Sequence, residues 1–366
     1  MMRDRRLLAA LLLTAGVLAL LGARPALAAE DGPSLGGYLE ETLLGQVKDA
    51  GFAGQLLSHL RLKVNWPEHD GLSARGEFDL NATGTNPAGG GETATVPAPP
   101  PLKVDRLYLR LMAGPTQATL GRQRIAWGNG TAFAPVDYFN PPNAVDPDGP
   151  RQGADGLLVR RSLGALGYVA AAAAYVDGSA ALASRGGSGG AGTGGLSGGL
   201  KAGAHVGKTD LSLGLGYDAL SGRSLAFAEA QGDLGVGWHA TAARLVSASG
   251  DGEKWTGAAG LDYSFGGKVV TRLEYAAGPA AGAASEQPRW SGAVTYSPDE
   301  VTSLSLSAMA ETAPGTPRTA VVSCSRIIGD AFDASVRLAW PFGVEQAAAL
   351  SPLGRGTVEA KVRYSF

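Results

Sequence analysis

The last eleven residues of the chain, residues 356–366, alternate strictly between apolar and polar side chains. One face carries Val358, Ala360, Val362, Tyr364 and Phe366, and the other carries Glu359, Lys361, Arg363 and Ser365. A period of two with one apolar and one charged face predicts a β-strand that lies between two different media. We therefore expect the same alternation in other strands of the chain.

The alternation recurs after residue 54. It is clear in residues 56–64, 72–82, 104–112, 117–127, 211–218, 255–265 and 332–340. In residues 117–127, Ile125 and Trp127 share one predicted face, and Arg122 and Arg124 share the other. The alternation is weakest in residues 166–176, which are mostly alanine, and in residues 319–328. Residues 35–47 have a mixed pattern that fits either a helix or a first strand.

The connections between these segments alternate in length. Short turns, such as residues 67–70, 113–115 and 207–208, are separated mostly by longer links, such as residues 83–101 and 177–196. Transmembrane β-barrels have short periplasmic turns and longer extracellular loops. The pattern predicts an all-β fold, a transmembrane antiparallel up-and-down β-barrel of about 16 to 18 strands, with 18 favoured. The count falls to about 16 if residues 35–47 are not a strand and if one pair of weakly alternating neighbouring segments forms a single strand.

The N-terminus has the features of a targeting segment. Arg3, Arg5 and Arg6 precede an apolar run at residues 7–21, and Ala26-Leu27-Ala28 is a small-x-small cleavage site. An apolar run of about 15 residues is shorter than the roughly 20 that a spanning helix needs. We therefore interpret residues 1–29 as a cleaved signal peptide and residues 30–366 as one barrel domain exported through the periplasm.

Composition argues against several functions. The net charge of −2 argues against binding to nucleic acid, which favours a basic chain. The single cysteine, Cys324, cannot form an internal disulfide. The four histidines show no metal-ligand spacing and no nucleophile motif is present, so we expect no metal, no cofactor and no enzymatic activity. A barrel hydrolase remains as a third hypothesis.

The most distinctive stretch is residues 120–151. It has Arg122 and Arg124 on a predicted strand, followed by a loop with five prolines and with the aspartates Asp137, Asp146 and Asp148. The sequences Gly-Arg-Gln at 121–123, Trp-Gly at 127–128 and Pro-Val-Asp-Tyr-Phe-Asn-Pro at 135–141 resemble a pattern in porin-like outer-membrane β-barrels. The nearest types are the alginate-export and substrate-specific porins.

This resemblance covers about a tenth of the chain together with the C-terminal strand, whose aromatic end resembles the assembly signal of such barrels. In these proteins a long loop commonly folds inward and narrows the pore. The resemblance implies the same for residues 128–153. The alternative is an ordered extracellular lid with no role in solute selection.

Charged residues suggest how such a pore could select solutes. Arg106, Arg110, Arg122 and Arg124 lie on two adjacent predicted strands and face inward on the predicted register. Clustered cations raise the local concentration of anions. We predict that these arginines form one wall of the pore and that Asp137, Asp146 and Asp148 on the loop form the opposing wall. Alternatively, the arginines pair with neighbouring carboxylates and only keep the lumen hydrated and rigid, without selecting solutes.

The six tryptophans lie mostly on predicted strands or at their ends, and they include Trp66, Trp127 and Trp340. This placement indicates aromatic girdles at the two membrane interfaces.

Together these features predict a porin-like channel in the outer membrane of a Gram-negative cell, for passive diffusion of small hydrophilic solutes with a mild preference for anions. The expected partners are outer-membrane lipid and lipopolysaccharide, the solutes, and the barrel-assembly machinery through the strand that ends in Phe366. The second hypothesis is a non-conducting barrel, plugged by its loops, that serves as a scaffold or export component.

Overall fold

The computed structural model describes residues 32–48, 51–86, 102–140, 153–176, 194–247, 252–279, 287–312, 318–342 and 356–366. These residues form 18 strands in one sheet. In chain order the strands are β1 (Ser34–Lys48), β2 (Gly51–His69), β3 (Leu72–Asn86), β4 (Leu102–Ala113), β5 (Thr116–Gln123), β6 (Ala154–Leu163), β7 (Gly167–Val176), β8 (Gly195–Val206), β9 (Thr209–Asp218), β10 (Arg223–Asp233), β11 (Gly237–Ser247), β12 (Glu253–Phe265), β13 (Val269–Ala277), β14 (Arg289–Tyr296), β15 (Thr302–Glu311), β16 (Arg318–Ile328), β17 (Phe332–Phe342) and β18 (Gly356–Ser365).

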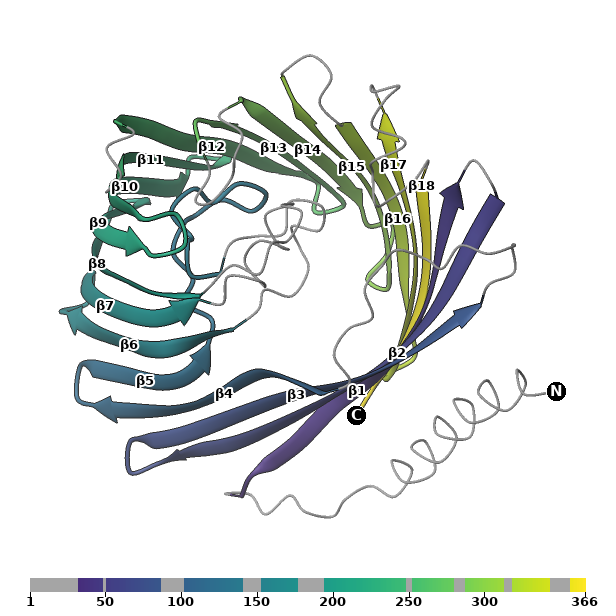
Figure 1. The fold of residues 1–366 in the computed structure, drawn as a ribbon, viewed down its shortest axis with the longest axis horizontal. Coiled ribbons are helices and arrows are strands. Elements are labelled where there is room, and N and C mark those ends of the chain that lie inside the picture. The colour runs from purple at the N-terminus through teal and green to yellow at the C-terminus, as the bar shows by residue number, and fades with distance from the viewer. Residues whose placement is uncertain are drawn as a thin grey trace.

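The sheet is closed. Each strand pairs antiparallel with its neighbours in the chain, and β1 pairs with both β2 and β18 (Figure 1). At the seam, the backbones of Gly37 and Phe366 exchange hydrogen bonds of 3.0 and 3.1 Å. Closure leaves no unpaired edge, as a sheet in lipid requires. The predicted all-β barrel with 18 strands is confirmed, and residues 35–47 belong to a strand.

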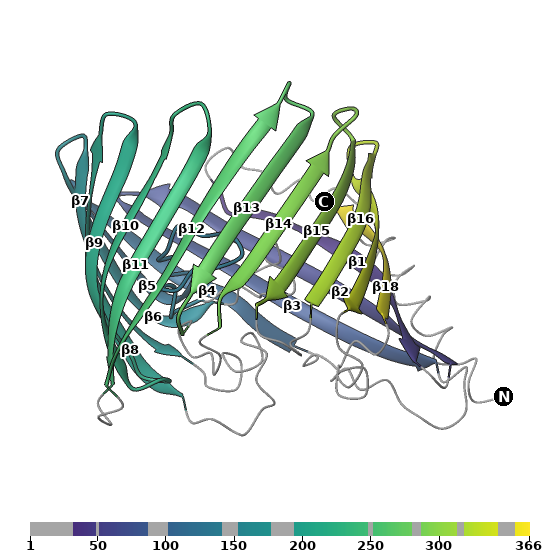
Figure 2. The same ribbon diagram turned by 90° about the horizontal axis from the view of Figure 1, so that it is seen from above.

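Tight turns connect the strands along one rim of the barrel, which is the upper rim in Figure 2. The turn between β2 and β3 consists of Asp70 and Gly71, whose φ angles are 50° and 79°. Two successive left-handed residues match a tight hairpin turn with the twist of a β-sheet. The predicted turn at residues 67–70 starts too early, because β2 continues to His69 through an irregularity after Trp66.

The strands alternate between an apolar outer face and a polar inner face. On β9, Leu213 is 66% exposed and points outward, whereas its neighbour Ser212 is 9% exposed and faces the interior. On β4, Leu107, Leu109 and Leu111 are all about half exposed and share the outer face. An apolar outer belt around a polar interior is the arrangement that lipid on one side and water on the other side demand.

Several predictions fall on residues outside the described ranges. They are the signal peptide at residues 1–29, Asp146, Asp148 and the second half of the loop at residues 128–153. Among the residues that the structure describes, no helix has the length and the apolar character to cross a membrane.

Candidate functional site

Residues 124–140, which we call the inward segment, run inside the barrel. The strand β5 ends at Gln123, and the chain then lies within the ring of strands (Figure 1). Ile125 and Tyr138 are fully buried, and Trp127 is 3% exposed. The segment fills part of the lumen and narrows it.

Internal hydrogen bonds fix the shape of the inward segment. The backbone N–H of Asp137 donates to the carbonyl of Ala134 at 3.1 Å, which closes a turn with Pro135 at its second position, where proline is favoured. The Asp137 carboxylate accepts the backbone N–H of Asn140 at 3.2 Å. The side chain of Asn140 in turn accepts the N–H of Ile125 at 2.6 Å, which ties the two ends of the segment together.

Aromatic side chains anchor the segment to the barrel wall. The Trp127 ring packs edge-on against Tyr138 and Phe139, with centroids 5.9 and 5.1 Å apart, and contacts Phe227 of β10. Small apolar side chains of β6, β7 and β11 complete this cluster, among them Ala174 and Ala243, which are fully buried. Burial of this cluster supplies the main driving force that keeps the segment inside.

Glycines on β8 and β9 make room for Tyr138. A Cβ atom at Gly216 would overlap the Tyr138 hydroxyl, and one at Gly199 would lie 2.5 Å from it. The hydroxyl donates to the carbonyl of Gly198 at 2.9 Å. Burial, together with nearby Asp218 and Asp137, raises the pKa of Tyr138, so the phenol stays protonated and keeps donating.

A single carboxylate holds the tip of the segment. Glu274 of β13 accepts the backbone N–H groups of Thr131, Ala132 and Phe133 at 3.0, 2.9 and 3.0 Å. Glu274 is 1% exposed, so these hydrogen bonds are shielded from water. Hydrogen bonds to a charged acceptor are stronger than neutral ones. Arg289 lies over the ring of Phe133 at 5.2 Å and adds a further contact.

The interior face of β18, β1, β2, β3 and β4 is lined with charged side chains, and we call it the charged wall. Its centre is Arg61, which makes two hydrogen bonds of 2.6 and 2.8 Å to Asp79. Arg61 also lies 3.3 Å from Asp105 and 3.6 Å from Glu77. A bulge opposite Glu77 turns Asp105 and Arg106 to the same side, so that β4 adds two consecutive charges to the wall.

The charged wall crosses the seam of the barrel. Arg363 of β18 binds Glu40 of β1 at 2.6 Å, and Lys361 lies 3.5 Å from the same carboxylate. The ring of Tyr38 on β1 lies between two guanidinium groups, with its centroid 4.4 Å from that of Arg363 on β18 and 5.8 Å from that of Arg61 on β2. Charged pairs therefore join the first and last strands where the cylinder closes.

Two of the predicted pore residues lie on the charged wall. Arg106 is 3.6 Å from Glu77. Arg110 faces the interior on the same strand, 5.6 Å from the ring of Tyr108. Their predicted orientation toward the lumen agrees with the structure.

The prediction for Arg122 is wrong, because the residue lies on the outer face. It is paired between Leu107 of β4 and Asp155 of β6, and it forms an ion pair with Asp155 at 3.2 Å. Leu120, two residues earlier, is 60% exposed on the outer face. Residues two apart on a strand share a face, so the alternation places Arg122 with Leu120.

Two other predictions near the loop need correction. Ile125 and Trp127 do not continue the strand to the lipid face but lie buried inside the barrel, so Trp127 is not a girdle residue. Asp137 is fully buried and stabilises the segment, so it does not offer its carboxylate to solutes as a pore wall. Arg124 is exposed and follows the end of β5.

The sequence did not indicate that Glu274, Tyr138 and the glycines beside Tyr138 hold the inward segment in place. One feature of the sequence did indicate that a segment lies inside the barrel. The alanines of β7 weaken the alternation in residues 166–176 because the inner face of this strand packs against the inward segment instead of water. An apolar inner face on a barrel strand thus indicates that something covers it.

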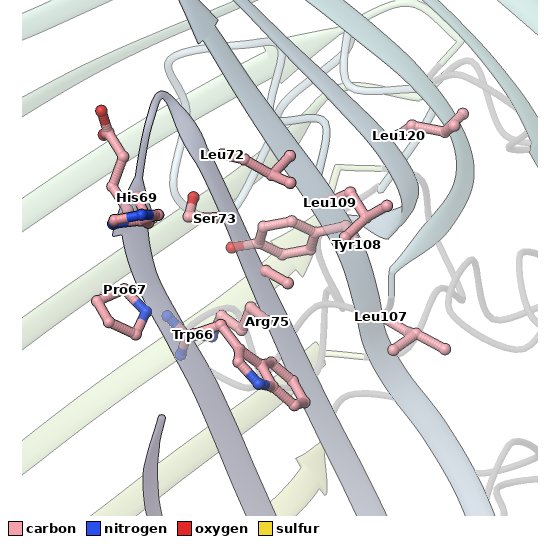
Figure 3. A pocket seen from close by; sticks show the side chains of 12 residues that line it. Trp66, Pro67, His69, Leu72, Ser73, Arg75, Leu107, Tyr108, Leu109 and Leu120 are labelled. Atoms are coloured by element: carbon pink, nitrogen blue, oxygen red, sulfur yellow. The ribbon is translucent and has the colours of Figure 1, made fainter. Parts of the chain in front are cut away.

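A hollow of about 960 Å³ lies at the turn between β2 and β3 (Figure 3). Trp66, Leu72, Leu109 and Leu120 line it, and all four belong to the exposed apolar outer face. This lining suits the lipid belt rather than a hydrophilic solute. Within the described ranges, no group of three or more His, Cys, Asp or Glu side chains is arranged to hold a metal ion.

Comparisons with solved structures identify several proteins with a similar fold. The chain is similar to OpdQ of Pseudomonas aeruginosa, with 10% identity, a TM-score of 0.62, and coverage of 91% of this chain and 98% of that chain. It is also similar to a BenF-like porin from Pseudomonas fluorescens Pf-5, with 12% identity, the same TM-score and the same coverage. OccK2 (OpdF) of Pseudomonas aeruginosa, solved in complex with glucuronate, gives 10% identity, a TM-score of 0.59, and coverage of 91% and 97%.

A comparison with curated proteins found no significant match. The family model described as Gram-negative porin matches residues 10–315, which is most of the chain. The porin-like resemblance is thereby confirmed, while the alginate-export type finds no support in these comparisons. The family match and the fold indicate a channel rather than an enzyme, which argues against the hydrolase hypothesis. The chain belongs to the Gram-negative porin family and is an outer-membrane β-barrel channel.

Proposed function

We propose that this porin conducts small hydrophilic solutes by passive diffusion and favours anions over cations. The observation that carries the proposal is the balance of charge on the charged wall. Its described interior side chains include eight basic and five acidic groups, a formal excess of three positive charges. The basic groups are Arg61, Lys63, Arg75, Lys103, Arg106, Arg110, Lys361 and Arg363, and the acidic groups are Glu40, Glu77, Asp79, Asp105 and Glu359.

The excess is carried by particular residues. All five carboxylates of the charged wall lie within ion-pair distance of a basic group. In the part of the chain that the structure describes, Lys63 and Arg110 instead face the rings of Tyr38 and Tyr108 and have no carboxylate within that distance. Cations without a paired acid attract anions into a narrow passage whose low-dielectric walls focus the electric field.

The inward segment strengthens this effect. Its contacts are with β6 to β15, so it narrows the lumen from the side opposite the charged wall. Solutes must then pass closer to the charged wall than in an open barrel. The presence of glucuronate, a hydroxylated carboxylate, in the OccK2 (OpdF) structure is consistent with anion passage through this fold.

Reversal potentials in planar bilayers test the proposal. Replacing Lys63 and Arg110 with glutamine should lower the chloride-to-potassium permeability ratio by roughly twofold, because it removes two cations that have no carboxylate within ion-pair distance. Arg326→Gln is a matched control, since Arg326 is exposed on the outer face of β16 opposite Thr302. An unchanged ratio in the double variant would refute the anion preference, and a wild-type barrel without conductance would favour the scaffold hypothesis.

We also propose that β18 and its terminal Phe366 present the chain to the barrel-assembly machinery. The proposal is supported by the position of the strand, because β18 forms the last pairing that closes the sheet. Its outward Tyr364 and terminal Phe366 have ring centroids 6.3 Å apart, and Tyr364 also contacts Phe332 at 4.9 Å. These rings form a compact aromatic patch at the seam.

A further inference from the structure

Two neighbouring cavities lie inside the barrel at the rim of tight turns, on the side of the inward segment. Their volumes are about 380 and 450 Å³. Asn129 of the inward segment, Asp210 of β9 and Gln231 of β10 line both of them. We call the two cavities together the vestibule. In a porin the short turns face the periplasm, so the vestibule lies at the periplasmic end of the inward path of a solute.

The vestibule differs from the charged wall in its charge balance. Four basic and three acidic side chains line it, and Glu229, which forms an ion pair with the lining residue Lys201, supplies a fourth acid. With the histidines neutral, the formal charge is zero. A site without excess charge gives no net attraction to a cation or an anion.

The vestibule is instead rich in groups that both donate and accept hydrogen bonds. The amides of Asn129 and Gln231 offer both functions, and Gln231 donates to Asp210 at 3.3 Å. Asp210 also pairs with His205 at 2.7 Å, which fixes the orientation of both side chains. Such side chains match hydroxyl groups, which likewise donate and accept.

Two lining residues, Trp238 and His239, have a buried ring nitrogen without a hydrogen-bond partner within the described residues. These atoms are Nε1 of Trp238 and Nε2 of His239. Arg160 lies flat on the ring of Tyr168, with its guanidinium carbon 4.1 Å from the ring centroid, and both residues line the other cavity. The stack fixes the guanidinium, and an immobilised donor loses less entropy when a ligand binds. A buried polar atom without a partner and a fixed donor are features of a binding site.

We propose that the vestibule binds a neutral, hydroxyl-rich solute of the size of a sugar alcohol. The volumes of both cavities fall in the range of about 300 to 1,000 Å³ that is usual for small-molecule sites. Asn129 places this site directly beside the inward segment, so a solute that passes the segment meets it next. The inference rests on the proposed channel function only in that the solute arrives through the lumen.

Calorimetry on the purified protein in detergent tests this directly, with sorbitol as the probe. Wild-type protein should bind sorbitol with a dissociation constant on the order of millimolar, the strength of a few exposed hydrogen bonds. Gln231→Leu and Asp210→Asn should each weaken binding by roughly fivefold, which corresponds to one lost hydrogen bond. Gln287→Leu is the matched control, because Gln287 precedes β14 at the opposite rim and does not line the vestibule.

Three outcomes would overturn the proposal. They are the absence of sorbitol binding, equal binding by the wild type and by both vestibule variants, and binding of gluconate but not of sorbitol, which would make the vestibule an anion site. Because calorimetry needs no conductance, a barrel that fails to conduct would refute the proposed channel function without deciding this one. Heat-modifiable migration on gels confirms that each variant is a folded barrel.

Discussion

The Glu274 carboxylate lies 3.0 Å from the backbone nitrogen of Phe133, although 141 residues separate them in the chain. The same carboxylate accepts two neighbouring N–H groups, so it holds the tip of the inward segment. Glu274→Ala leaves three backbone donors without their acceptor, at a cost of about 1 to 3 kcal/mol for each one that stays buried. We expect the tip to detach.

Single-channel recording checks this prediction. Detachment should raise the conductance of Glu274→Ala and add open-channel noise, because the lumen widens and the segment moves. Glu300→Ala is the control, since Glu300 is an exposed residue in the turn between β14 and β15. A quiet channel of wild-type conductance would show that the aromatic cluster alone holds the segment.

Gly216→Val should displace Tyr138 from the barrel wall. The new side chain would occupy the position of the Tyr138 hydroxyl, and the neighbouring strands leave the ring no free space. We expect increased conductance and a change in the fluorescence of Trp127, which packs on Tyr138. Gly292→Val is a suitable comparison, because the nearest atom to its new Cβ is 3.9 Å away. Equal behaviour of the two variants would argue against close packing at Gly216.

Arg122→Ser should leave ion selectivity unchanged, because Arg122 pairs with Asp155 on the outer face. Arg110→Ser should shift the reversal potential toward cation preference, since Arg110 faces the lumen. The two substitutions remove the same charge from neighbouring strands, so each serves as the control for the other. A larger shift for Arg122→Ser would mean that the register of β5 is wrong.

The variant Phe366→Ala tests whether the aromatic ring serves assembly in the cell rather than the stability of the folded barrel. The backbone hydrogen bonds between Phe366 and Gly37 do not need the aromatic ring, so the purified variant should still refold in detergent. Its yield of folded barrel in the outer membrane should fall, if the ring is part of an assembly signal. Gly37→Val should fail in both assays, because its side chain would overlap the backbone of Arg61 at the seam. Normal yield of Phe366→Ala in cells would contradict the assembly proposal.

The barrel itself could be predicted from the sequence because its signal is local. Alternation such as that of Leu213 and Ser212 shows which side of a strand meets lipid, and most strands carry this pattern. The turns add a second local signal through residues such as Gly71, which adopt left-handed conformations. Both signals lie within a few residues, so the strand number followed without any knowledge of distant contacts.

The interior could not be predicted in the same way. The path of the inward segment depends on contacts between distant parts of the chain, such as that of Tyr138 with Gly198. The pattern also misled at the end of β5. Ile125 and Trp127 continue an apparent alternation after the strand has ended, which reversed the assignment of Arg122. Apolar residues that follow a strand can face lipid or a buried cluster, and periodicity alone does not separate these cases.

The zero-current potential of the purified wild-type channel across a tenfold gradient of potassium chloride tests the central claim most directly. The account predicts a measurable conductance and a potential whose sign shows chloride to be more permeant than potassium, because the charged wall has more cations than carboxylates. A potassium-selective potential, or a folded barrel that carries no current, would contradict it.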